Sequence, residues 1–141
     1  MHIGGSDGRE ALVNNPLTYA ERVAMWKTVL GANGFEPAEY EIGPFPIEAP
    51  QQLVDFVPQS CICATTIREP WNKAKVSTLI KEGYTVDVLY EDQSKPVSGS
   101  QIRGLMRRGD KKWRALVPEG VEDFLAKTGI LDRMIAAMSN K

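Results

Sequence analysis

Hydrophobic and polar positions along this chain follow two periods, one typical of helices and one typical of strands. Apolar residues three and four positions apart predict helices over residues 18–30, 70–82, 98–108, 118–127 and 131–138, with about two further helical turns at 50–57. Apolar or alternating runs predict strands at 60–66 and 84–90, and the proline-interrupted segment 40–47 predicts a short edge strand.

The apolar positions of these helices are expected to face a core, and the strand at 60–66 reads as one covered on both faces. The predicted inward residues are Val23, Trp26, Val29, Leu30, Leu53, Phe56, Val57, Val76, Leu79, Ile80, Ile102, Leu105 and Met106. Trp113 and the methionines are expected to fill the same core.

Helices that alternate with strands imply a parallel sheet and a three-layer α/β domain. The length of 141 residues favours a single domain, 1–141, whose tail helix occupies about 129–141. Ligands of such folds bind beyond the carboxyl ends of the strands. Three turns are expected at that edge: Gly4 to Ser6, Thr66 to Trp71, and Ser98.

Two helix starts have the spacing of a capping box, Thr18 with Glu21 and Ser98 with Gln101. The second has two hydroxyls, a glycine and Arg103 within about one turn, a combination that suits a phosphate. An ordinary capped surface helix gives the same spacing, so this pattern alone leaves both interpretations open. Pro118 is predicted to be the first residue of the following helix.

Charge and composition narrow the function. A net charge of −1 and a pI near 5.9 argue against non-specific nucleic-acid binding. No apolar run is long enough for a membrane span and the N-terminus does not resemble a signal peptide, so a cytoplasmic protein is expected. Cys61 and Cys63 should share one strand face as small buried hydrophobes, and with His2 they do not make a zinc site.

Four segments, in order, resemble the nicotinamide-nucleotide adenylyltransferases of the nucleotidyltransferase superfamily, archaeal type. The family motif S-G-T-x-[IV]-R is similar to Ser98 to Arg103, and N-P-[FL]-T-x-x-E-R is similar to Asn15 to Arg22. The family strand G-Y-x-V resembles Gly83 to Val86, and W-x-x-L-[VL]-P resembles Trp113 to Pro118. The resemblance implies a Rossmann-like α/β/α fold.

The resemblance implies adenylyl transfer from ATP to a mononucleotide such as NMN, with release of pyrophosphate, in NAD biosynthesis. It implies that Arg103 is the catalytic cation, that Mg²⁺ travels with ATP, and that no protein-held metal is needed. ATP phosphates would contact Gly5, Ser6, Ser98, Gly99, Ser100 and Arg103. Secondary candidates are Asn15, Thr18 and Arg22, although an arginine in the position of Arg22 equally suits a solvated helix face.

The acceptor, a phosphorylated small molecule, would contact Pro46, Ile47 and Glu48, which resemble a family P-[IV]-x-D-I-E segment. Leu53 stands where archaeal members have a tryptophan that stacks on the nicotinamide ring, so that stacking is lost. Trp71 either replaces it or packs the start of a helix. Homo-oligomers are expected by analogy with archaeal members.

The family's first strand ends in G-R-F-x-P-x-H-x-G-H, and this chain contains no such segment; His2 is its single histidine. The expected sheet is therefore N-terminally incomplete, or closes in another way. Whether the chain is an enzyme by itself stays open, and the alternative is a non-catalytic nucleotide-binding module or a truncated remnant. A cytidylyltransferase is disfavoured, because the Asn15 and Trp113 segments look like the adenylyl branch.

Overall fold

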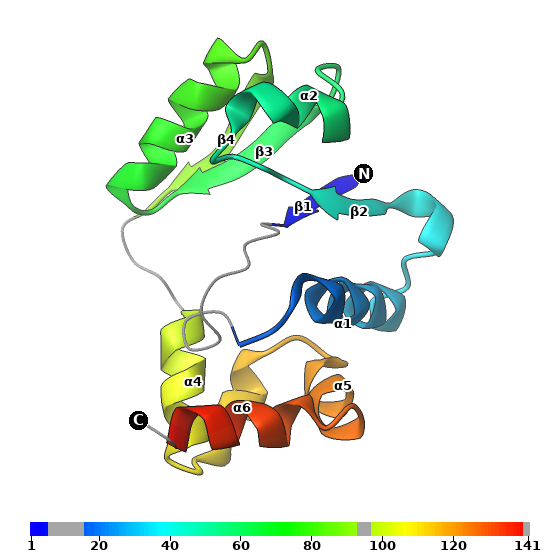
Figure 1. The fold of residues 1–141 in the computed structure, drawn as a ribbon, viewed down its shortest axis with the longest axis vertical. Coiled ribbons are helices and arrows are strands. Elements are labelled where there is room, and N and C mark those ends of the chain that lie inside the picture. The colour runs from blue at the N-terminus through cyan, green and yellow to red at the C-terminus, as the bar shows by residue number, and fades with distance from the viewer. Residues whose placement is uncertain (6–15, 93–96, 140–141) are drawn as a thin grey trace. The chain divides into compact units, whose positions relative to one another are not determined.

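The computed structural model describes residues 1–5, 16–92 and 97–139, whose helices and strands are labelled in Figure 1. The chain is mixed α/β, and it divides into two compact units that are treated one at a time below. Of the described residues, unit 1 contains Met1, 16–42 and 97–139, and unit 2 contains 2–5 and 43–92. The predicted α/β class with parallel strands is confirmed.

Unit 1 is mainly helical. Its elements are α1 (Tyr19–Ala32), the 3-10 helix Pro37–Glu39, α4 (Gly99–Arg107), the 3-10 helix Lys111–Leu116, α5 (Val121–Lys127) and α6 (Ile130–Ser139). The chain passes from unit 1 to unit 2 within β2 (Glu41–Pro44). The predicted tail helix is present as α6.

The core of unit 1 is rich in methionine, as the composition of its helices predicts. Its buried residues are Met106, Trp113, Val121, Leu125, Ile130, Met134 and Met138. Ile102 and Leu105 pack against them, so the predicted inward face of α4 is confirmed. Flexible thioether side chains fill the irregular gaps where short helices meet, and full burial of each stabilises the fold by about 1.5–3 kcal/mol.

Unit 2 is built on a β-α-β element. Strand β3 (Ile62–Ile67) pairs in parallel with β4 (Thr85–Glu91), and α3 (Pro70–Lys81) connects them. The pairing places Cys63 opposite Val86 and contains an irregularity between Thr65 and Thr66. A separate two-stranded sheet joins β1 (His2–Gly5) to β2, and a 3-10 helix (Pro50–Gln52) precedes α2 (Leu53–Phe56).

The core of unit 2 lies on one face of the β3–β4 sheet. Leu53, Val57, Leu79 and Tyr84 are buried together, and both cysteines pack against them as free thiols. The Tyr84 hydroxyl donates to the carbonyl oxygen of Val57 at 2.7 Å, which satisfies the polar end of a ring that is otherwise buried.

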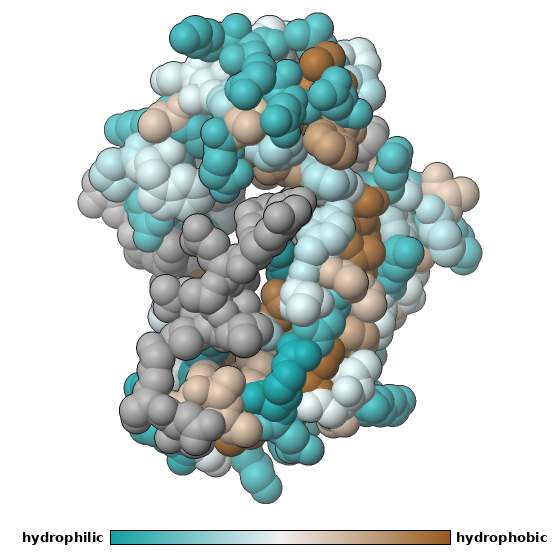
Figure 2. Space-filling view, viewed as in Figure 1, coloured by the Kyte–Doolittle hydropathy of each residue, from teal (hydrophilic) through white to brown (hydrophobic). Residues whose placement is uncertain are grey.

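Three predicted inward residues are exposed instead: Trp26 at 46%, Phe56 at 44% and Ile80 at 59%. The prediction of a strand covered on both faces is also wrong within the described residues, because Ile62 is 67% exposed. Single-sequence periodicity cannot separate a half-covered strand from a fully covered one. Apolar and hydrophilic residues appear next to one another on the face shown in Figure 2.

The start of α5 also differs from its prediction. The helix begins at Val121, and Gly120 caps it with a φ of 94°. Because a backbone in this left-handed region cannot continue a right-handed helix, Pro118 lies in the preceding turn. Among the described residues, no helix is long and apolar enough to cross a membrane.

Candidate functional site

The start of α4 has the predicted cap. Ser98 is extended, with φ −125° and ψ 153°, and its Oγ accepts a hydrogen bond from the amide of Gln101 at 3.1 Å. The helix then begins at Gly99, so its other first-turn amides point outward from the helix end. Ser98 is half-buried, and Gly99, Ser100 and Gln101 are exposed. This end is therefore accessible to a ligand within unit 1.

Arg103 folds back over the start of its own helix. Its Nη2 donates to the Ser100 hydroxyl at 3.3 Å, and its Nη1 lies 2.9 Å from the position that a Cβ on Gly99 would occupy. A larger residue at position 99 would displace the guanidinium. Gly99, expected to contact the ATP phosphates, makes room for Arg103 in this structure.

The charge at this helix start is unusual. The first turn of α4 contains no acidic residue, and Arg103 forms no ion pair with any described residue. A cation beside the positive end of a helix dipole is unfavourable by about 0.3–1 kcal/mol. A bound anion would make this helix start favourable, because it would attract both the guanidinium of Arg103 and the amides of the first turn.

The start of α1 has the opposite arrangement. The Thr18 hydroxyl accepts from the Glu21 amide at 3.2 Å, and Glu21 Oε1 accepts from the Thr18 amide at 2.8 Å, which closes the predicted capping box. Arg133 of α6 donates from Nη2 to Glu21 Oε1 at 2.8 Å. Arg133 and the helix-start contacts hold the pKa of Glu21 at about 2, against partial burial that raises it. Here both charges are already paired.

Arg22 lies one turn into α1. It is half-buried, and its guanidinium carbon lies 5.9 Å from the centre of the Tyr19 ring. Of the two interpretations of Arg22, full solvation is therefore excluded. Asn15 and Ser6 lie outside the described residues, and Gly5 is the last residue of β1.

The acceptor candidates belong to unit 2. Pro46 and Ile47 are half-buried, Glu48 is exposed, and Ile47 packs against the core. Leu53 is 0% exposed, which corrects its expected role: a side chain with no accessible surface cannot contact an acceptor in this conformation. Leu53 is instead the core residue that its helical spacing predicts.

Trp71 is 58% exposed on the first turn of α3, and its indole N–H donates to the Glu69 carboxylate. Trp71 therefore contacts the N-cap of α3 through Glu69 and leaves more than half of its surface accessible. The Glu69 and Arg68 amides both donate to Oδ1 of buried Asn72, at 2.9 and 3.0 Å, which holds the loop before α3 in place.

A cavity of about 450 Å³ lies at the carboxyl ends of β3 and β4, where ligands of parallel sheets bind. It is lined by Ile67, Arg68, Glu69, Pro70, Lys73 and Glu91. Lys73 pairs with Glu91 at 3.1 Å, and Arg68 lies over the Tyr90 ring at 5.1 Å and donates to its hydroxyl. Sequence reasoning missed Arg68, Asn72 and Lys73, although their place directly after a strand was a usable signal.

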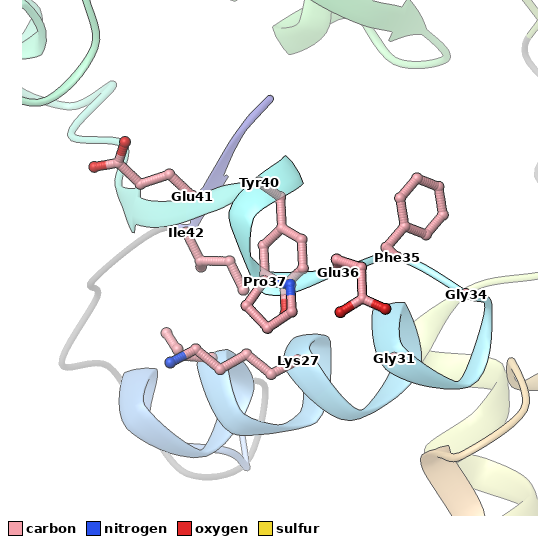
Figure 3. A pocket seen from close by; sticks show the side chains of 10 residues that line it. Lys27, Gly31, Gly34, Phe35, Glu36, Pro37, Tyr40, Glu41 and Ile42 are labelled. Carbon is pink, nitrogen blue, oxygen red and sulfur yellow. The ribbon is translucent and has the colours of Figure 1, made fainter.

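A second cavity, of about 680 Å³, was not predicted and lies along α1 in unit 1. Figure 3 shows Lys27 and Tyr40 at this cavity, with the carboxylate of Glu41 pointing away from it. None of the predicted site residues lines it. The part of the chain that the structure describes contains no group of three His, Cys, Asp or Glu side chains placed to hold a metal ion.

Comparison with known proteins agrees with the motifs. No protein-family model matches the chain. It is 30% identical, over 123 residues, to the phosphonoformate cytidylyltransferase of Streptomyces viridochromogenes, covering 87% of this chain and 66% of that protein. It is 27% identical to the nicotinamide-nucleotide adenylyltransferases of Pyrobaculum arsenaticum and Ignicoccus hospitalis, covering 97% and 94% of this chain and 77% of each relative.

The chain belongs to the nucleotidyltransferase superfamily and is similar to the nicotinamide-nucleotide adenylyltransferases. It spans about two thirds of the length of the cytidylyltransferase that it matches. The preference for the adenylyl branch over the cytidylyl branch is not supported by these identities, since the cytidylyltransferase is the more similar of the three. The base of the nucleotide is therefore open.

Proposed function

We propose that this chain carries the triphosphate-binding part of a nucleotidyltransferase site, centred on Ser98, Gly99, Ser100 and Arg103. The observation that carries the proposal is the Arg103 guanidinium, which lies over the start of α4 with no ion-pair partner among the described residues. A triphosphate supplies the missing anion. Buried or half-buried charge-assisted contacts of this kind contribute about 1.5–3 kcal/mol each.

The similarity to nucleotidyltransferases supports the following reaction. An oxygen of the acceptor attacks the α-phosphorus of a nucleoside triphosphate, the α–β phosphoanhydride bond breaks, and pyrophosphate leaves with the electron pair. Arg103 and the first amides of α4 hold the β- and γ-phosphates and balance the charge that develops on the leaving pyrophosphate. Thr18 and Arg22, at the start of α1, are the secondary candidates for the same nucleotide.

Mg²⁺ enters as part of the substrate, bound to triphosphate oxygens and water. A cytoplasmic location and self-association belong to the same proposal; the first rests on a sequence without an apolar run long enough for a membrane span, and the second on analogy with the archaeal family.

On the acceptor side, the proposal assigns Pro46, Ile47, Glu48 and Trp71 to a phosphorylated small molecule such as NMN. Exposed Trp71 offers a flat ring at the carboxyl edge of the β3–β4 sheet. The cytidylyltransferase relative supports a second candidate, cytidylyl transfer from CTP to a small phosphonate or phosphate. Both candidates need the same phosphate contacts at α4, so they differ in the base and the acceptor.

Calorimetric titration of the chain with MgATP and with MgCTP tests whether the chain binds a triphosphate and which of the two bases it prefers. Arg103→Ala should weaken binding of the preferred nucleotide by about 1.5–3 kcal/mol, roughly tenfold to a hundredfold. Arg107→Ala, at the far end of the same helix, is the matched control and should leave the affinity unchanged. Equal affinities for wild type and Arg103→Ala would refute the site.

A pyrophosphate-release assay then separates enzyme from binding module. It pairs the preferred triphosphate with NMN, with nicotinate mononucleotide and with a phosphonate in turn. Nucleotide binding without release for any acceptor would favour the non-catalytic module. Release with one acceptor would identify the branch.

A further inference from the structure

Helix α6 contacts both nucleotide-binding segments of unit 1, although the sequence places it at the tail of the chain. It packs against α4 through the shared core, in which Met134 and Met138 lie with Met106. It reaches the start of α1 through Arg133, whose partners are more than a hundred positions away in the sequence. One helix therefore touches the elements that carry Arg103 and Thr18.

Hydrogen bonds connect α6 to the start of α1: Arg133 contacts Pro16 and Glu21, and Glu21 in turn contacts Thr18. Arg133 Nη2 donates to the carbonyl oxygen of Pro16 at 3.0 Å and to Glu21 Oε1 at 2.8 Å. That same Glu21 oxygen accepts from the Thr18 amide at 2.8 Å. The guanidinium thus connects the segment that enters α1 to the carboxylate that closes its first turn.

This connection is less exposed, and has more hydrogen bonds, than a typical surface ion pair. The Glu21 side chain is only 19% exposed, whereas that of Arg133 is 47% exposed. Pro16, which supplies the carbonyl, is buried. A guanidinium that bridges a backbone carbonyl and a carboxylate fixes the direction of both groups, which a single exposed pair does not do.

We propose that Arg133 is a positioning residue for nucleotide binding: through Pro16 and Glu21 it sets the start of α1, and with it Thr18 and Arg22, while α6 braces α4. The inference rests on the proposed function of the Ser98 to Arg103 segment. Arg133 itself touches neither the nucleotide nor the reacting atoms. Displacements of about 1 Å in positioning groups are sufficient to change transferase activity strongly.

Three variants of the full chain test this role by titration with the preferred triphosphate. Arg133→Gln should weaken nucleotide binding roughly fivefold to tenfold. Arg133→Lys, which keeps the charge and one of the two contacts, should recover part of that loss. Glu21→Gln should weaken binding by a similar factor, and the double variant should be no worse than either single one, because both remove the same connection.

Glu122→Gln is the matched control. Glu122 pairs with Arg114 at 2.9 Å in the same unit, with side-chain exposures of 41% and 45%, and it does not contact α1 or α4 in any described ion pair. This variant should leave nucleotide affinity unchanged. Thermal unfolding of every variant is followed in parallel, so that each affinity is measured well below the midpoint of unfolding.

A purely structural role would lower the midpoint of unfolding for Arg133→Gln and leave the affinity of the folded protein unchanged; that result would overturn the proposal. Additive losses in the double variant would overturn the coupling through Glu21. If the wild-type chain binds neither ATP nor CTP, the proposed function itself fails and the positioning role fails with it. Nucleotide binding by the wild-type chain, together with weaker binding by the Arg133→Gln variant, is the result that supports both the proposed function and the positioning role.

Discussion

The two capped helix starts of unit 1 have similar sequences and opposite electrostatics. At α1, Thr18 caps a turn whose third residue is Glu21, and Arg133 comes from another helix to pair with it. At α4, Ser98 caps a turn whose third residue is the neutral Gln101, and Arg103 comes from the helix itself. The first start has a carboxylate and a guanidinium in contact, and the second has a guanidinium with no carboxylate partner among the described residues.

This difference separates a helix start whose charged groups are already paired from one whose guanidinium has no ion-pair partner among the described residues. In a capping box closed by an internal ion pair, the carboxylate and the guanidinium already balance each other. A helix start with a guanidinium and no carboxylate stays unfavourable until an anion binds. The sequence motif S/T-x-x-E/Q covers both cases, and the residue that distinguishes them is the acid or amide at its last position.

The largest expected effect comes from removing the ion pair at the start of α1. Glu21→Gln should reduce the free energy of unfolding by about 1–2 kcal/mol, since it removes a hydrogen-bonded ion pair whose guanidinium is partly screened by water. Denaturant unfolding at pH 7 measures the change. A loss below about 0.3 kcal/mol would show that the pair is no stronger than an ordinary surface pair.

The same pair predicts a pH dependence. The pKa of Glu21 falls from 4.5 to about 2 on folding, so its contribution is complete above about pH 5.5 and is lost as the pH falls through 4.5 towards 2. Wild type should therefore lose more stability than Glu21→Gln over that interval. Parallel stability curves for the two proteins between pH 6 and pH 2 would contradict the assignment.

The next largest effect comes from giving the start of α4 an acidic third residue, as the start of α1 has. Gln101→Glu places a carboxylate at the third position of α4, where it stabilises the helix by about 0.3–1 kcal/mol and competes with phosphate for Arg103. Nucleotide affinity should fall roughly tenfold while the midpoint of thermal unfolding rises. Gln101→Ala removes the amide without adding charge and serves as the control. A rise in stability with unchanged affinity would show that the nucleotide binds elsewhere.

The smallest expected effect is the difference in stability between the two cap variants. Thr18→Ala should cost about 1–2 kcal/mol of stability, because it disrupts a box that is closed on both sides. Ser98→Ala should cost only about 0.5–1 kcal/mol, since a single cap hydrogen bond is lost. Calorimetric unfolding of both variants without nucleotide compares them. The reverse order would mean that the Ser98 cap is strengthened by contacts other than the one to Gln101.

Much of the local structure followed from the sequence. The caps at Thr18 and Ser98, the inward face of α4 and the tail helix depend on residues within four or five positions of one another. Interactions at such short separations are set by backbone geometry, so spacing is sufficient to predict them. The prediction of Pro118 as a helix start was wrong for a local reason too, because Gly120 adopts a left-handed backbone.

Burial was less predictable than helix position. Trp26, Phe56 and Ile80 have the spacing of core residues and are exposed, whereas Leu53, which has the same spacing and was also expected at the acceptor, is fully buried. Spacing tells which residues share a face of an element, and it does not tell which faces another element covers. That depends on the packing of segments distant in the sequence.

The sequence by itself determined the α/β class, the order of the elements, the two capped starts and the superfamily, since all of these are encoded in short motifs and periodicities. Only the tertiary structure decided how the two starts differ. The Arg133 contact to Glu21 joins residues 112 positions apart, and the fold of Arg103 over Gly99 depends on a rotamer choice. Neither a long-range contact nor a side-chain rotamer has a signature in local spacing, and these two features separate the structural cap from the proposed phosphate site.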